Sequence, residues 1–234
     1  MLHYALMQET IIISVGGSLI VPDQIDTTFL SALKHLVTTE IVRGKQFVII
    51  TGGGKTARRY QDAARNVSDL AVDDIDWIGI HATRLNGHLL RTIFRDVAYR
   101  TMITNPDDVL DIPRETPLII ASGYRPGSST DLRAVQIAER RGAQKLVNLS
   151  NIDYVYTADP KKDPAAEKIE HISWTEFRKL IPPEWDPGLS SPFDPVAARE
   201  AERLGIEVAI LNGTKIEELE NYLEEKPFIG TIIR

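Results

Sequence analysis

The chain contains no cysteine among its 234 residues. Disulfides, thiolate metal sites and cysteine nucleophiles are therefore excluded, and a reducing compartment such as the cytoplasm is the expected location. No apolar run approaches the roughly 20 residues that a membrane-spanning helix needs, so no membrane span is expected. The first ten residues lack a basic region and a long apolar stretch, which argues against a signal peptide.

An excess of positive charge is also missing. The 33 acidic residues outnumber the 27 lysines and arginines, which gives a net charge of −6 and a pI of about 5.4. This balance argues against nonspecific binding to nucleic acid. The 5 histidines show no paired spacing typical of a metal site, so no metal-ligating residues are predicted.

The most informative segment that is present reads T-G-G-G-K-T-A-R-R-Y at 51–60. It follows the apolar, β-branched run at 47–50, which predicts a buried strand, and it precedes a stretch without Pro or Gly that predicts a helix. Glycines at such a turn let backbone N–H groups approach a ligand, and a helix N-terminus favours negative charge. Because Lys55, Arg58 and Arg59 add full positive charges, the segment predicts a phosphate site.

Two common phosphate loops are excluded for this segment. A P-loop needs a glycine five residues before the glycine of Gly-Lys-Thr, and Ile49 occupies that position. The dinucleotide-binding pattern fails because Ala57 stands where its last glycine would be. Taken alone, the glycine-rich turn fits a structural turn as well as a ligand site, so the neighbouring segments decide between them.

Apolar runs and helical patterns alternate along the whole chain. This order predicts an α/β fold, a three-layer αβα sandwich with a mainly parallel central sheet. At 43% hydrophobic residues, the chain can bury a substantial core as one domain. The predicted strands are 10–15, 46–50, 118–121, 145–149, 207–211 and 229–233, and the predicted helices are 26–43, one from Gly54, 76–100, 131–141, 195–204 and 215–222.

Polar or glycine-rich segments follow four of the predicted strands, at 16–18, 52–54, 122–123 and 150–151. Ligands of parallel sheets bind beyond the carboxyl ends of the strands, so these segments are expected to form one site. The proline-rich stretch 182–195 is interpreted as a functional or mobile loop and not as a domain boundary.

Five motifs resemble those of one known family. V-G-G-S-L at 15–19 and G-G-G-K at 52–55 are similar to two glycine loops of the amino acid kinase family. D-W-I-G-I-H-A-T-R-L-N at 76–86 and G-Y-R-P-G-S-S-T-D at 123–131 resemble stretches specific to UMP kinases. N-I-D-Y-V-Y-T-A-D-P at 151–160 resembles the family's ATP loop. The resemblance covers nearly the whole chain and is strongest to UMP kinases of the archaeal type.

The resemblance implies transfer of the γ-phosphoryl group of ATP to UMP, with Mg²⁺ as cofactor. It also implies a homohexamer, an acceptor half at 1–142 and an ATP half at 143–234. The implied UMP-binding residues are Gly53, Asp76, Tyr124, Arg125, Pro126, Gly127, Ser128, Ser129 and Thr130. The implied ATP-binding residues are Gly16, Gly17, Gly54, Arg58, Ser150, Asn151, Tyr156 and Asp159, and the implied catalytic residues are Arg58, Asp131 and Asp194.

The chain departs from the family pattern at two positions. Many members carry a lysine where this chain has Ser14, although UMP kinases of the archaeal type lack it too. Tyr154 replaces a glycine of the ATP loop and would strain the turn if that position needs a positive φ. Because Ser14 stands where those members have the lysine, another cation must replace it, and the candidates are Lys55, Arg58, Arg125 and Lys161.

Alternative explanations stay open for single residues and for the whole chain. Asp131 and Asp194 also fit ordinary helix starts. Asp131 follows Thr130, a possible N-cap, and Asp194 precedes Pro195 and would itself be an N-cap. The chain could be a kinase of the same fold that phosphorylates a carbamate, an acyl amino acid or an isoprenoid phosphate. It could also bind nucleotide without turnover, as the molybdenum storage proteins do, an alternative that Ser14 and Tyr154 support. Turnover separates the last alternative from the kinases.

Overall fold

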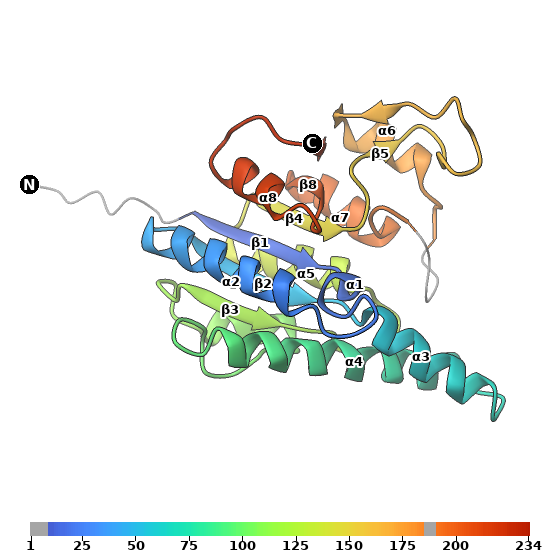
Figure 1. Cartoon of the computed structure of the whole chain (residues 1–234), viewed down its shortest axis with the longest axis horizontal. Coiled ribbons are helices and arrows are strands. Elements are labelled where there is room, and N and C mark those ends of the chain that lie inside the picture. The colour runs from blue at the N-terminus through green and yellow to red at the C-terminus, as the bar shows by residue number, and fades with distance from the viewer. Residues whose placement is uncertain (1–8, 185–190) are drawn as a thin grey trace, which may run out of the picture.

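A seven-stranded sheet forms the centre of the computed structural model, which describes residues 9–184 and 191–234 (Figure 1). The strands are β1 (Thr10–Val15), β2 (Gln46–Thr51), β3 (Leu118–Ala121), β4 (Lys145–Ser150), β7 (His171–Ile172), β8 (Glu207–Asn212) and β9 (Gly230–Ile233), and a separate hairpin pairs β5 (Val155–Tyr156) with β6 (Lys168–Ile169). The helices are α1 (Gly17–Ile20), α2 (Thr27–Val42), α3 (Gly54–Arg65), α4 (Val72–Ile93), the 3₁₀ helix η1 (Pro106–Asp111), α5 (Thr130–Arg141), α6 (Trp174–Leu180), α7 (Pro195–Leu204) and α8 (Ile216–Leu223).

The strand order is β3-β2-β1-β4-β8-β9-β7. The five strands from β3 to β8 are parallel to one another, whereas β9 runs antiparallel to β8. The mainly parallel α/β fold is therefore confirmed. Because the carboxyl ends of β3, β2, β1, β4 and β8 share one edge, the loops that follow them meet there, as the sequence predicts.

Helices cover both faces of the sheet, and each face has its own apolar core. Along β1, Ile12 packs with α5 and α7 on one face, while Ile11 and Ile13 pack with α2 and α8 on the other. This alternation follows from the two-residue period of a strand that is buried on both sides. In the described part of the chain, no helix combines the length and the apolarity needed to cross a membrane.

The predicted strands and helices match the structure to within one residue, with one exception. The long helix was predicted at 76–100, and this prediction is wrong because α4 spans Val72–Ile93. After α4, the chain turns to pair with the edge strand β3: the Tyr99 N–H donates to the Leu118 carbonyl (2.8 Å) and the Ile103 N–H to the Ile120 carbonyl (3.0 Å). Pairing with an otherwise open sheet edge ends the helix early.

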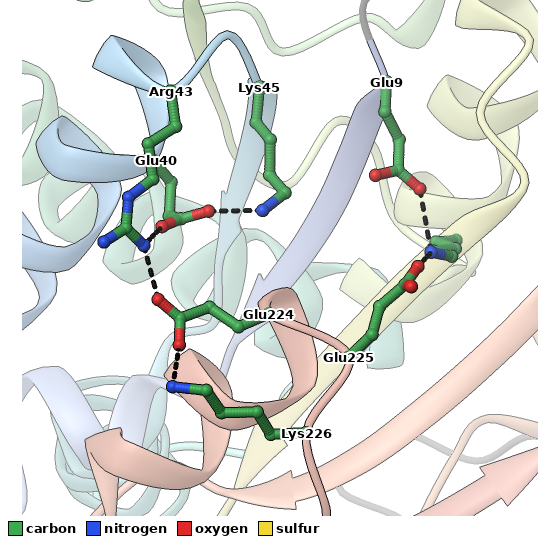
Figure 2. A network of polar contacts seen from close by, with 8 residues as sticks. Glu9, Glu40, Arg43, Lys45, Glu224, Glu225 and Lys226 are labelled. Carbon is green, nitrogen blue, oxygen red and sulfur yellow. Dashed lines mark hydrogen bonds and ion pairs between the residues drawn. The ribbon is translucent and has the colours of Figure 1, made fainter.

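Eight charged residues form a network near the amino ends of β1, β2 and β4, at the edge of the sheet away from the predicted site (Figure 2). Glu40 is fully buried, so its carboxylate needs partners. It forms ion pairs with Arg43 at 2.5 Å and with Lys45. Arg43 also reaches Glu224 at 2.5 Å. The remaining members are Glu9, Lys145, Glu225 and Lys226.

Glu225 is the one non-glycine residue with a positive φ (57°) in the described part of the chain. The αL conformation costs an L-residue about 1 kcal/mol, and the ion pair of this exposed carboxylate with Lys145 at 3.4 Å contributes less than that. Glu225→Gly is therefore expected to raise the free energy of unfolding by about 0.5–1 kcal/mol, measured by urea unfolding. Glu225→Ala removes the same ion pair and keeps the strain, so an equal gain in this control would contradict the explanation.

Candidate active site

The turns after β1 and β2 are in direct backbone contact. A Cβ atom added to Gly17 would lie 2.3 Å from the Gly54 nitrogen and 2.5 Å from the Gly52 oxygen. A Cβ on Gly54 would lie 2.3 Å from the Gly17 carbonyl carbon, and Gly54 has a φ of +60°. Only glycine fits this contact, and the two turns therefore act as one rigid unit.

This unit presents backbone donors and cations. Gly53 precedes α3 and supplies no side-chain cap, so the first N–H groups of this helix are left for a ligand. Lys55 and Arg58 are exposed on α3, and their side chains have no hydrogen-bond or ion-pair partner in the part of the chain that the structure describes. Arg59 instead pairs with Asp23 in the α1–α2 connection. The positive charge available to a ligand thus comes from Lys55 and Arg58.

Helix α4 ties the turns after β2 and β3 together. The buried Asn86 side chain donates from Nδ2 to the Gly52 carbonyl (2.8 Å). Thr83 Oγ1 accepts from the Gly123 N–H (2.8 Å), and the Thr83 carbonyl accepts from Thr51 Oγ1 (2.9 Å). The motif at 76–86 therefore positions two of the four converging loops.

The loop at 123–130 is held over α4 by two side chains. Asp76 Oδ2 accepts a hydrogen bond from the Gly127 N–H (2.9 Å). Arg84 donates to the Tyr124 carbonyl (2.9 Å) and more weakly to the Gly123 carbonyl (3.3 Å). The structure therefore brings Asp76 together with the loop to which Tyr124, Arg125, Pro126, Gly127, Ser128, Ser129 and Thr130 belong.

The end of this loop starts helix α5. Ser129 is the N-cap, because its Oγ accepts from the Leu132 N–H (3.1 Å), and Thr130 is the first residue of the helix. The sequence had pointed to Thr130 as the possible cap, so the cap lies one residue earlier. Asp131 consequently stands in the first turn of α5, where a negative charge is favourable.

The half-buried Asp131 and the buried Ser14 and Asp194 form a polar cluster at the sheet edge. Ser14 Oγ donates to Asp131 Oδ1 (3.1 Å), and the Asp194 N–H donates to Asp131 Oδ2 (3.3 Å). Burial, and secondly the charge of Asp194, raises the pKa of Asp131 from 3.8 to about 6. Asp194 also caps α7 through the Ala197 N–H (2.7 Å). The carboxylate of Asp131 is therefore costly in the protein alone and suited to meet a cation.

The loop after β4 lies beside the turn after β1. The Gly16 N–H donates to the Leu149 carbonyl (2.8 Å), which places Gly16 next to Ser150 and Asn151. Tyr156 and Asp159 follow on the β5–β6 hairpin. In the two described stretches, no hydrogen bond joins either side chain to the glycine turns; Asp159 Oδ1 instead accepts from the Lys161 N–H (3.0 Å).

Tyr154 does not have a positive φ, since Glu225 alone does so among the described non-glycine residues. The strain that a left-handed conformation would have caused at this position is therefore absent. The turn is held by Asp153, whose Oδ1 accepts from Asn212 Nδ2 and Lys215 Nζ, both at 2.8 Å. The hydrogen bond from Lys215 lowers the pKa of Asp153. The sequence does not predict the ion pair between Asp153 and Lys215, because the two residues are 62 positions apart.

The proline-rich stretch 182–195 is only partly described. Residues 185–190 lie outside the described residues, as do residues 1–8, where a signal peptide was not expected. In the described part of this stretch, Arg199 of α7 donates to the Pro183 carbonyl (2.8 Å), and Asn148 of β4 to the Pro192 carbonyl (3.3 Å). Both flanks of the gap are thus tied to the ATP half predicted from the sequence.

Comparisons with known proteins agree on one family. Residues 9–212 match the amino acid kinase family. The chain is 35% identical to a uridylate kinase from Methanospirillum hungatei JF-1 over 226 residues, which cover 96% of this chain and 94% of that protein. The crystal structure of uridylate kinase from Archaeoglobus fulgidus superposes with a TM-score of 0.80 at 26% identity, over 96% of this chain and 99% of that one. A UMP kinase structure from Ureaplasma parvum shares the fold, with a TM-score of 0.77 at 20% identity over 97% and 98%.

Proposed function

The chain belongs to the amino acid kinase family, and we propose that it transfers the γ-phosphoryl group of ATP to UMP, giving ADP and UDP. The observation that carries the proposal is the order of the loops at the sheet edge. The 123–130 loop, which Asp76 holds, follows β3, the touching glycine turns follow β2 and β1, and Ser150 ends β4. An acceptor and a donor on either side of the glycine turns would bring their phosphates together between them.

Phosphoryl transfer requires positioning and neutralisation of charge more than acid–base chemistry. In our proposal, the backbone N–H groups at the start of α3 and the exposed Arg58 hold the phosphates. Ser14 carries no charge and is already bonded to Asp131, so it does not replace the missing lysine. Lys55, one turn before Arg58 on the same helix, is the second cation that we place at the transferred group.

The site division assigns each predicted residue to one substrate. We assign UMP to Gly53, Asp76 and the 123–130 loop, and ATP to the turns after β1 and β4. Gly54 and Arg58 contact ATP from α3, while Tyr156 and Asp159 approach it from the hairpin. Asp131 and Asp194 organise the groups between the substrates, which fits the hydrogen bond between them at 3.3 Å. Residues 1–142 then form the acceptor half, and residues 143–234 form the ATP half.

Mg²⁺ belongs to this proposal as the cofactor of ATP. No group of three or more acidic or histidine side chains suited to a metal occurs in the described residues. Magnesium in such enzymes keeps waters and is held by substrate phosphates plus one or two carboxylates, so this donor set fits it. Asp131 would be the protein carboxylate nearest to it. When bound, Mg²⁺ supplies charge neutralisation on the phosphates.

We extend the proposal to a homohexamer located in the cytoplasm. Apolar side chains are exposed on α3 and α4, which pack along each other at one end of the molecule (Figure 1). Such a face is typical of a subunit contact. Its main members are Tyr60 on α3, Trp77 and Leu85 on α4, and Val67 in the connection between these helices.

Asp76→Ala is expected to raise the KM for UMP by about 10-fold to 100-fold, because the variant loses a charge-assisted hydrogen bond to the loop and a carboxylate facing the acceptor. The KM for ATP should stay within about twofold. The measurement is ADP formation by the wild type and the variant, with each substrate varied in turn. Asp74→Ala, an exposed acid in the first turn of the same helix, is the matched control. Equal losses for UMP and ATP would contradict the division into halves.

A further inference from the structure

Arg133 is a buried cation that has no acidic partner among the described residues. It is 5% exposed and lies on α5, one turn from the N-cap Ser129. No carboxylate pairs with it in the described residues, and burial lowers its pKa. The N-terminal turn of a helix disfavours positive charge, so both burial and the helix dipole oppose this guanidinium. An apolar residue would serve the packing of α5 better.

The contacts of Arg133 lead to the 123–130 loop. One terminal nitrogen donates to Ser128 Oγ, and the other donates to Gln136 Oε1 (2.6 Å). The guanidinium carbon also lies 5.2 Å from the centre of the Tyr124 ring, within the range of a cation–π contact. A single side chain thus contacts residues near both ends of the loop.

Ser128 has a fixed hydroxyl direction in this arrangement. Its hydroxyl oxygen accepts from Arg133, and its O–H donates to the Arg125 carbonyl (3.3 Å). From the opposite side, α4 holds the same loop through Asp76 and Arg84. The loop is therefore attached to α4 on one side and to α5 on the other, and Arg133 makes the α5 attachment through side-chain contacts to Tyr124 and Ser128.

We propose that Arg133 is a positioning residue that fixes the 123–130 loop in the conformation that binds UMP. This inference rests on the proposed function for its substrate. Fixing the loop before binding removes the entropic cost of ordering it when the acceptor arrives, so Arg133 acts on affinity for UMP and leaves the ATP half unaffected. The unfavourable burial of its charge is retained because the loop needs a rigid attachment at this point.

Arg133→Met tests the proposal, since methionine fills similar space without charge or donors. The expected result is a rise of about 10-fold or more in the KM for UMP, with the KM for ATP within about twofold and little change in kcat. Arg133→Lys keeps the charge but not the planar fork, and it should restore part of the affinity. Ser128→Ala combined with Arg133→Met should give less than the product of the two single effects.

Arg141→Met is the matched control. Arg141 lies at the other end of α5, is 6% exposed, and donates to the carbonyls of Ile112, Pro113 and Arg114. Like Arg133, it has an Nε that finds no hydrogen-bond partner in the part of the chain that the structure describes. Its loss should lower the melting temperature and leave both KM values unchanged. If Arg133→Met behaves in the same way, or raises both KM values together, the proposal is overturned.

Hydrogen exchange without substrates separates this inference from the proposed function. In Arg133→Met, the amides of the 123–130 loop, including the Gly127 N–H bonded to Asp76, should exchange at least about tenfold faster than in the wild type. In Arg141→Met they should not. A wild type that forms no UDP would refute the proposed function, whereas unchanged exchange in Arg133→Met would refute the role of Arg133.

Discussion

Asp131→Asn is expected to lower kcat by about 10²–10³-fold and at the same time to stabilise the folded protein at pH 8. The loss of activity follows because the negative charge that organises Ser14 and the Asp194 backbone is removed from the centre of the site. The gain in stability follows because this charge is unfavourable in the folded protein, where burial raises the pKa of Asp131 to about 6.

The pH dependence of this gain has a definite sign. The folded protein holds the Asp131 proton more tightly than the unfolded chain, whose ordinary pKa is 3.8. The cost is therefore absent below pH 3.8, grows between pH 3.8 and about 6, and is complete above that range. The difference between these two pKa values corresponds to a cost of ~3 kcal/mol when the carboxylate is ionised. The asparagine amide can accept one hydrogen bond fewer than the carboxylate, and this loss offsets ~1 kcal/mol of the gain in stability.

Thermal unfolding of the wild type and Asp131→Asn at several pH values measures this balance. At pH 8 the variant should be more stable by ~2 kcal/mol, and the difference should fall towards zero or reverse slightly by pH 4. Ser14→Ala, which removes a donor but keeps the charge, should be less stable than the wild type at pH 8. A less stable Asp131→Asn at pH 8, or wild-type kcat in this variant, would contradict the account of the cluster.

Gly54→Ala is expected to abolish most activity and to destabilise the fold by about 3 kcal/mol or more. The new methyl group would lie 2.3 Å from the Gly17 carbonyl carbon, 2.4 Å from its oxygen and 2.7 Å from the Ser18 nitrogen. These are backbone atoms that cannot rotate away, so the two glycine turns must separate. A displacement of about 1 Å at this point costs on the order of 10²-fold in kcat.

Gly142→Ala separates steric overlap from backbone strain. Gly142 has a φ of +70°, close to that of Gly54, but a Cβ there would meet no atom of the described residues within 4 Å. Its replacement should therefore cost only about 1 kcal/mol and leave kcat unchanged. The measurements are urea unfolding and steady-state kinetics of both variants. Similar losses for Gly54→Ala and Gly142→Ala would show that the contact between the turns is unimportant.

The strands and the glycine turns could be predicted because their signals are local. The run at 47–50 is apolar and ends at three glycines, so both β2 and the turn after it follow from the sequence. Helix ends also carry local signals: the side chain of Asp26 accepts a hydrogen bond at the start of α2, and Gly142 ends α5 in a left-handed conformation. The convergence of four loops followed from the parallel sheet alone.

The missed features depend on contacts between distant residues. The end of α4 is set by pairing with β3, which the helical pattern of 76–100 cannot reveal. Two-residue strands such as β5 are too short for periodicity to show. Helix α6 was not predicted, although its start carries a local signal. Ser173 and Glu176 have capping-box spacing, and the Ser173 hydroxyl accepts from the Glu176 N–H (3.3 Å).

The sequence names candidate site residues but not the contacts between them. The bond between Ser14 and Asp131 joins residues 117 positions apart, so the sequence identified Ser14 only as a departure from the family pattern. Arg133 looks like an ordinary helix residue in the sequence, and only its burial beside Tyr124 and Ser128 leads to the role proposed for it. Charge and spacing along the chain cannot predict such contacts.

The most direct test of the proposed function is ADP release from ATP and Mg²⁺ with UMP, CMP, AMP, GMP and carbamate offered one at a time. We predict rapid turnover with UMP, with UDP as the second product, and far slower turnover with the other acceptors. Turnover with a different acceptor would keep the kinase chemistry and contradict the assignment of UMP to the 123–130 loop. Measurable ATP binding without turnover on any acceptor would contradict the proposed phosphoryl transfer itself.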